Sequence, residues 1–269
     1  MAGLEFVLQS AAVMAPGLPS LAHFRAVSRG AQPYEHAPLV VPPAAMLPAQ
    51  ERRRASIAVR LVLACAQEAL QGCSVPASDI HTVFATDEGT GEVCQQMLEA
   101  LAATRQVSPL VFSNSVVNAP SGYFSIACSN RQSSTVVSLG LESFASGLLC
   151  AVTETHARRR PVLFISYDPP MTKPMDELLC VHEAIASAWL IDGEPASQAS
   201  LASFAVTLES RDAAGESQIA QWMPPQWVHC SSARGVEALR LVDAPAGSLA
   251  RFGLGAQWLT LRRTGRIDS

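Results

Sequence analysis

The chain has 269 residues, of which 49% are hydrophobic and only 16% are charged, and its formal net charge is −4. This length suffices for one large or two small domains with a substantial core. Because so few residues are charged, much of the surface must be uncharged, and we expect a partner to cover part of it. The acidic balance provides no basic surface, which argues against a nucleic-acid partner.

The seven cysteines are scattered, without a Cys-x-x-Cys pair or a spacing typical of metal ligands. This pattern favours free thiols in a reducing cytoplasm over a disulfide framework or a zinc site. Residues 1–24 lack a basic segment and are interrupted by Glu5, Pro16 and Pro19, so we expect neither a signal peptide nor a membrane span there. We predict a cytoplasmic protein that uses no metal or cofactor.

The first part of the chain predicts strand, loop and helix in turn. Residues 4–7 and 11–14 predict an opening strand with its following bend, closed by Pro16 and Gly17, and the proline-rich residues 28–50 predict a loop over the domain surface. Residues 50–70 show a helical apolar period that ends at Gly72. The run from Arg52 to Arg54 lies in the first turn of this helix and opposes its dipole, which favours pairing with acidic groups or a partner over anion binding.

A second strand and helix follow at residues 80–104. Ile80 to Thr86 is a continuous apolar run, typical of a strand buried on both faces. The following Gly-Thr-Gly lacks the third glycine and the lysine of a phosphate loop, so nucleotide binding is disfavoured. Asp87 and Glu88 invite a metal or acid/base assignment, but adjacent carboxylates at a strand end are more typical of a helix N-cap and a solvated loop.

The next elements continue the alternation. Residues 110–129 predict a helix capped by Asn118, with Pro120 in its first turn and a buried face that begins at Tyr123, Phe124 and Ile126.

Further strands are predicted at residues 162–167, 200–208 and 257–262, and helices at 175–190 and 236–241. Cys180 and His182 are two residues apart on a predicted helix, which puts them on different faces and favours packing over catalysis. The alternation of strands and helices predicts an α/β protein with a largely parallel sheet.

Chemistry, if the chain carries any, is expected at residues 134–149. A β-branched run from Thr135 to Leu139 is followed by Gly140 and then by the apolar period of a buried helix. In α/β enzymes such a turn often presents a nucleophile at the head of the helix, where unpaired N–H groups and the macrodipole stabilise an anion. The residues offered here are Gly140, Leu141, Glu142 and Ser143, and none is a cysteine.

Several segments together resemble the short β-ketoacyl-synthase-like proteins that are described as chain-length factors in aryl-polyene and xanthomonadin-type pigment clusters. The resemblance spans about residues 4–262, and its most specific segments are 47–54 (LPAQERRR), 112–126 (FSNSVVNAPSGYFSI), 142–149 (ESFASGLL) and 161–170 (PVLFISYDPP). It implies an α/β fold of the thiolase (ketosynthase) type, formed as a single domain over residues 1–269. It further implies a complete first half, 1–209, and a truncated second half, 210–269.

The departures from that family concern its catalytic groups. A working ketosynthase has its acyl-accepting cysteine at the turn, in the position that corresponds here to Leu141, and a leucine cannot supply a thiolate. The paired histidines of ketosynthases lie in the second half, where this chain has only His229, which we interpret as structural. Val117 stands where the short family often has histidine.

The resemblance implies a non-catalytic subunit, a chain-length factor, that pairs with an active β-ketoacyl synthase as a heterodimer. Together they would elongate acyl or polyene chains on an acyl carrier protein, and the strand Ser134 to Leu139 would pair across the dimer axis. The residues expected to form the interface or border the partner's acyl tunnel are Asn114, Asn118, Pro120, Tyr123, Val136, Leu139, Leu141 and Phe144.

Two alternatives stay open. In the first alternative, the chain is a condensing enzyme or acyltransferase with an atypical nucleophile, for which the candidates are Ser143, Cys150 and Cys128. The sequence places no histidine beside these residues to act as a base. Otherwise it is a homodimeric scaffold or binding module.

Overall fold

The computed structural model describes residues 3–179, 181–193, 200–211 and 220–265. Its eight strands form one sheet in the order β3-β2-β4-β5-β1-β6-β8-β7. The strands are β1 (Leu4–Met14), β2 (His81–Ala85), β3 (Ser134–Val137), β4 (Val162–Asp168), β5 (Ile185–Asp192), β6 (Ala202–Ser210), β7 (Leu249–Leu254) and β8 (Gln257–Gly265).

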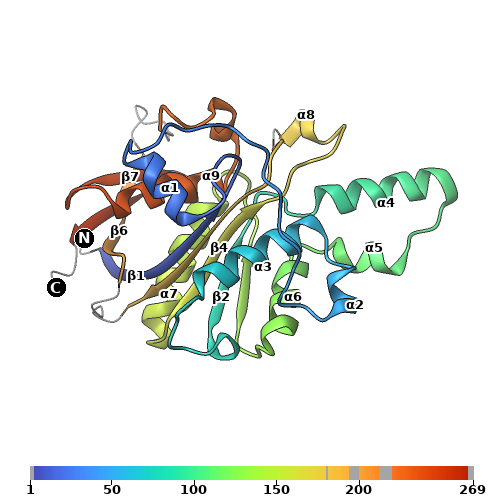
Figure 1. The fold of residues 1–269 in the computed structure, drawn as a ribbon, viewed down its shortest axis with the longest axis horizontal. Helices are drawn as coiled ribbons and strands as arrows, with labels where there is room; N and C mark the ends of the chain where they lie inside the picture. The colour runs from blue at the N-terminus through green and yellow to red at the C-terminus, as the bar shows by residue number, and fades with distance from the viewer. Residues whose placement is uncertain (1–2, 180, 194–199, 212–219, 266–269) are drawn as a thin grey trace.

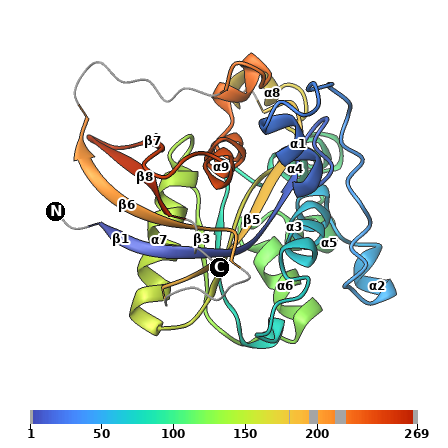
Figure 2. The same cartoon turned by 60° about the vertical axis from the view of Figure 1, so that its left-hand side comes forward.

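Helices lie on both faces of this sheet (Figure 2). They are α1 (Leu21–Ser28), α2 (Ala49–Arg52), α3 (Ile57–Ala69), α4 (Gly91–Thr104), α5 (Pro109–Asn114), α6 (Ala119–Cys128), α7 (Ser143–Arg158), α8 (Asp176–Leu179) and α9 (Ala233–Leu239). Short 3-10 turns, η1 (Ala77–Asp79), η2 (Pro225–His229) and η3 (Arg240–Val242), complete the regular structure. Across the described ranges, no helix combines the length and apolar character needed to span a membrane.

Two apolar layers sandwich the sheet. α3 and α6 pack on one face, while α1, α7 and α9 pack on the other. β4 lies between these layers and is buried along its whole length, as its continuous apolar sequence predicts. α4 and α5 project away from the sheet (Figure 1).

The prediction of a largely parallel sheet is wrong. Only β2 is parallel to its neighbours β3 and β4, and every other adjacent pair of strands is antiparallel. The error arises at residues 175–190, which form the short α8 and then β5 instead of one helix. β5 is buried on both faces, and a short apolar run of this kind fits a buried helix as well as a strand.

The predicted helix over residues 50–70 is also interrupted. α2 ends at Arg52, and α3 begins after Ser56, whose side chain accepts a hydrogen bond from the backbone N–H of Val59. The arginine run therefore lies at a turn between two helices. Arg52 donates hydrogen bonds to the carbonyls of Ala45 and Leu47, so one of the three arginines fixes the preceding loop.

Other strand and helix predictions are confirmed with small shifts in their ends. β1 is continuous from Leu4 to Met14, with an irregular register at residues 8–10, and β2, α4, α6, α7, β4, β6, α9 and β8 lie where the periodicity indicated. α1, α5 and β7 were not anticipated. Ile126, predicted to be buried, is 56% exposed, whereas Phe124 is in the core.

One buried carboxylate joins the strand ends to the C-terminal region. Asp168, at the end of β4, is 1% exposed. Its Oδ1 accepts hydrogen bonds from Thr86 Oγ1 (3.0 Å) and the Asp87 N–H (2.7 Å). Its Oδ2 accepts from Cys230 Sγ (3.3 Å) and the Ser232 N–H (2.8 Å). These four donors satisfy the charge that burial would otherwise make costly.

α9 packs very closely on the sheet at Gly235. A Cβ atom at this position would lie 2.2 Å from Ser187 Oγ on β5 and 3.2 Å from the Phe144 ring on α7. Glycine is therefore required for α9 to approach β5 and α7 at this distance. The close packing sets the position of the residues that precede and begin α9.

We predict that Gly235→Ala lowers the free energy of unfolding by about 1–3 kcal/mol, because the added methyl overpacks a filled core. The matched control is Gly122→Ala in α6, where a Cβ would meet no atom within 4 Å. There alanine should stabilise by about 0.5–1 kcal/mol through lower chain entropy. Urea unfolding of both variants measures the difference, and equal effects would contradict the packing described for α9.

A second prediction concerns pH. Burial, together with the charges of Asp168 and Glu88, raises the pKa of Asp87 from 3.8 to about 6. Asp87 therefore binds a proton more tightly in the folded state than in the unfolded chain, and its contribution to the free energy of unfolding should fall as pH rises between these two values.

Asp87→Asn should remove this dependence and make the protein more stable than the unsubstituted chain at about pH 7. Urea unfolding at several pH values between about 4 and 7 measures it. Glu99→Gln, which changes an exposed carboxylate of α4, is the control. If Asp87→Asn and Glu99→Gln give the same pH profile, the assignment to Asp87 is incorrect.

Candidate functional site

The turn between β3 and α7 is held by its own polar groups. β3 ends at Val137, so Leu139 belongs to the turn instead of the strand predicted over 134–139. Gly140 has a φ of 59°, in the left-handed region that glycine adopts easily. Ser143 Oγ accepts a hydrogen bond from the Leu139 N–H and donates one to the Gly140 carbonyl, both at 2.7 Å.

Neighbouring elements fix the turn from two further sides. Ser138 Oγ donates to the Asp87 carbonyl at 2.7 Å, which ties the turn to the loop after β2. The Phe144 N–H, in the first turn of α7, donates to Ser231 Oγ at 2.9 Å. Ser231 precedes Ser232, which binds Asp168, so the turn and the start of α9 are joined to the same strand ends.

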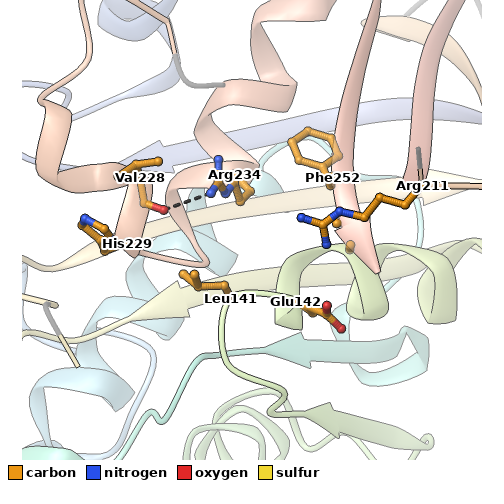
Figure 3. Close-up of a pocket in the computed structure, with 9 residues that line it drawn as sticks. Leu141, Glu142, Arg211, Val228, His229, Arg234 and Phe252 are labelled. Atoms are coloured by element: carbon orange, nitrogen blue, oxygen red, sulfur yellow. Dashed lines mark hydrogen bonds between the residues drawn. The ribbon is translucent and has the colours of Figure 1, made fainter. Parts of the chain in front are cut away.

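A cavity of about 490 Å³ lies beside this turn (Figure 3). Its walls come from the turn, the first turn of α7, the end of β6, η2, α9 and β7. The residues that line it are Leu141, Glu142, Ala145, Arg211, Val228, His229, Arg234, Phe252 and Gly253. The head of α7 therefore faces a pocket of the size that small ligands occupy.

The structure changes the interpretation of His229. The sequence placed no histidine near the turn, yet η2 brings His229 into the same cavity as Leu141. Arg211, Arg234 and Phe252 also line this cavity and were not anticipated, because they lie far from the turn in sequence. The small residues Ser231, Ser232, Ala233 and Gly235 are the sequence feature that could have indicated a close approach of backbones in this region.

The candidate nucleophiles have unfavourable surroundings. Ser143 is fully buried, and its hydroxyl is already used within the turn. Burial raises the pKa of Cys128 to about 11 and also raises the pKa of Cys150, which lines a separate groove on α7. Cys230, beside Asp168, is fully buried, and its pKa is raised well above the usual value of a thiol. A raised pKa leaves little thiolate at neutral pH.

The residues predicted for an interface or tunnel differ widely in exposure. Leu139 is 59% exposed and Leu141 46% exposed, whereas Phe144 is fully buried, with its ring against those of Phe164, Trp189 and Phe252. Phe144 is thus a core residue, and its side chain reaches no outer surface.

The segment from Asn114 to Tyr123 likewise contains both buried and exposed side chains. Asn114 is buried, and its Nδ2 donates to the carbonyls of Arg54 and Leu110. Asn118 occupies the N-cap position of α6 and is exposed, without a side-chain capping bond. Pro120 is buried and Tyr123 is half-buried, as is Val136 on β3. This segment therefore presents a mixture of structural and accessible groups.

Acidic residues near the turn have structural partners. Glu88 lies in the loop before α4, as predicted, but the N-cap position is occupied by Thr90, whose backbone N–H and hydroxyl both donate to the Glu88 carboxylate. Glu142 Oε1 accepts from the Gly255 N–H at 3.0 Å. Within the described ranges, no group of three or more His, Cys, Asp or Glu side chains is arranged to hold a metal ion.

Comparison with known structures supports the fold. A chain from the complex of the ketosynthase ApeO with its chain length factor ApeC from Xenorhabdus doucetiae has a TM-score of 0.72 and 22% identity, with 97% of this chain and 100% of that chain covered. A chain of the ishigamide ketosynthase/chain length factor has a TM-score of 0.69 and 12% identity, with 97% and 99% covered.

A third match, at lower similarity, comes from AntDE:AntF, a type II polyketide-synthase acyl-carrier protein in complex with its ketosynthase. It has a TM-score of 0.61 and 11% identity, with 78% of this chain and 70% of that chain covered. No curated protein sequence matches this chain.

The sequence itself also matches a family model. Residues 27–241, well over half of the chain, match the N-terminal domain of β-ketoacyl synthases. This range includes β2, β3, the turn, α7 and the start of α9, and so most of the pocket described above. The chain therefore belongs to the β-ketoacyl synthase family.

Proposed function

We propose that this protein is a chain-length-factor-type subunit, which performs no condensation itself and pairs with an active β-ketoacyl synthase. The observation that carries this proposal is a hydrogen-bonded turn at the place where the resemblance puts the nucleophile, which presents Leu141 to a cavity next to a sheet edge that is open in the described structure. The turn is built as for catalysis, with a helix head beneath a cavity, yet its outward side chain is an inert hydrocarbon.

The sheet edge offers a surface for the partner. β3 is the terminal strand, and in the described part of the chain only β2 pairs with it. Exposed apolar side chains occur in the turn, in α5 and α6, and in the connection between these two helices, namely Phe112, Val116, Val117, Ile126, Leu139 and Leu141. An open edge with exposed apolar residues is a natural pairing surface, because a second strand would satisfy its backbone groups and cover these side chains.

The comparisons support a partner of this type. Two of the similar structures are complexes that contain both a ketosynthase and a chain length factor, and a third contains a ketosynthase with an acyl-carrier protein. We infer that this chain pairs with a ketosynthase through β3 across a two-fold axis and meets the carrier protein only as part of that complex. Leu141 and the accessible part of the Asn114–Tyr123 segment would then border the partner's acyl tunnel, where their bulk limits the length of the chain. The division into a complete half, 1–209, and a reduced half, 210–269, stays a prediction.

Co-expression with the ketosynthase of the same gene cluster should give a 1:1 complex that co-purifies. Leu139→Glu should weaken this complex at least tenfold, because pairing would bury a charge on an apolar surface. Leu249→Glu is the matched control, since Leu249 is a 40% exposed leucine on β7, at the opposite end of the sheet. Size-exclusion chromatography and titration of a labelled subunit give the two affinities.

Two results would contradict the proposal. One is a monomer that does not bind the ketosynthase. The other is an equal loss of affinity for Leu139→Glu and Leu249→Glu, which would mean that β3 is not the pairing edge. Circular dichroism of each variant tests whether its fold is retained.

The rival function is a condensing enzyme or acyltransferase with an atypical nucleophile. The specific observation in its favour is that His229 shares the pocket with the turn, so a potential base is present. Against it, Ser143 is enclosed, and burial raises the pKa of each candidate thiol.

Intact-mass measurement distinguishes the two functions. After incubation of the complex with acyl- or malonyl-carrier protein, we expect an acyl adduct on the ketosynthase subunit and an unchanged mass for this chain. Alkylation of the ketosynthase cysteine beforehand serves as the control. An adduct on this chain that persists after that treatment would establish it as an enzyme.

A further inference from the structure

The pocket beside the turn has two arginines and one carboxylate among its described lining residues. The arginines are Arg211 and Arg234, the carboxylate is that of Glu142, and His229 also lines the pocket. The chain as a whole has a net charge of −4, so this local balance runs against the overall one. Two guanidinium groups in one cavity are suited to bind an anionic group.

Arg234 is held rigidly inside the protein. It lies in the first turn of α9, is only 7% exposed, and donates a hydrogen bond from Nη2 to the Val228 carbonyl at 2.9 Å. Burial lowers the pKa of its guanidinium, and the nearby charge of Glu237 acts in the opposite direction.

Arg211 approaches the same space from the end of β6. Its guanidinium carbon lies 4.5 Å from the centroid of the Trp258 ring. Stacking of this kind fixes the plane of the group and leaves its N–H donors free to point sideways. Figure 3 shows both guanidinium groups above the turn, with Phe252 beside them. Glu142, at the rim, is held by the Gly255 N–H.

The remaining walls are apolar. Leu141, Ala145, Val228 and Phe252 surround the cavity, whose volume of about 490 Å³ is ample for a ligand larger than a simple ion. A free inorganic anion would leave these side chains in contact with water. A molecule with one anionic end and one apolar end would satisfy both kinds of wall.

We propose that this pocket is a binding site for an organic monocarboxylate with a short aliphatic or aromatic tail. The carboxylate lies between Arg211 and Arg234, and the tail packs on Phe252 and Leu141. The site goes beyond the chain-length role proposed above and does not depend on it, since every group in it comes from this chain. Its ligand class follows from the two arginines and the apolar wall together.

Isothermal titration calorimetry with octanoate tests the site in the full chain, purified alone or with its ketosynthase. Octanol is the matched neutral probe, and inorganic phosphate and acetate are the anions without a tail. We expect saturable binding of octanoate, at least tenfold tighter than that of the other three probes. Arg211→Gln should weaken octanoate binding about tenfold or more, since charge-assisted hydrogen bonds contribute roughly 1.5–3 kcal/mol.

The control variant is Arg262→Gln, which removes an exposed arginine of β8 that does not line the pocket and should leave the affinity unchanged. Arg234→Lys, which retains the buried charge, should weaken binding by losing the planar pair of donors. Each comparison is made in the same preparation, so binding by a co-purified ketosynthase cancels. Equal binding of octanoate and octanol, phosphate binding as tight as octanoate, or equal affinities of Arg211→Gln and Arg262→Gln would each overturn the proposal. The strength of the ketosynthase complex is measured separately and is unaffected by these outcomes.

Discussion

The buried carboxylate of Asp168 is the interaction on which the arrangement of the site depends. It lies at the end of β4, where the parallel strands adjoin the antiparallel part of the sheet, and receives donors from the loop after β2 and from the residues before α9. A lone carboxylate buried to this extent would be very unfavourable, so the backbone N–H groups of Asp87 and Ser232 are obliged to stay beside it. Regions far apart in sequence thereby meet at the carboxyl ends of β2 and β4.

The same convergence of segments also fixes the shape of the turn before α7. Ser138 binds the Asp87 carbonyl, and Ser231, next to Ser232, accepts the Phe144 N–H. The side chain that faces the pocket contributes nothing to these bonds. Leu141 is therefore a position in the turn at which the side chain can change without loss of the hydrogen bonds that hold the turn.

The sequence predicts the elements with a clear period and fails where two structures fit the same pattern. β2, α4, α7 and β4 were recognisable because each has a sustained apolar repeat or an uninterrupted buried run. β5 was mistaken for helix because its apolar run has no distinguishing period. The pocket was only half predictable. Leu141 and Glu142 follow from the local pattern, whereas Arg211, His229 and Arg234 are brought there by tertiary contacts that no local pattern encodes.

The two edge strands of the sheet, β3 and β7, differ in the side chains around them. β3 presents exposed apolar neighbours, whereas β7, the other terminal strand in the described structure, carries Arg251, whose guanidinium contacts Glu209 on β6 at 3.2 Å. If β3 could pair with β7 of another copy, association would be head-to-tail and would continue into a fibre. A charged side chain on the outer strand discourages such growth. The difference between the two edge strands thus disfavours an open head-to-tail array of this chain.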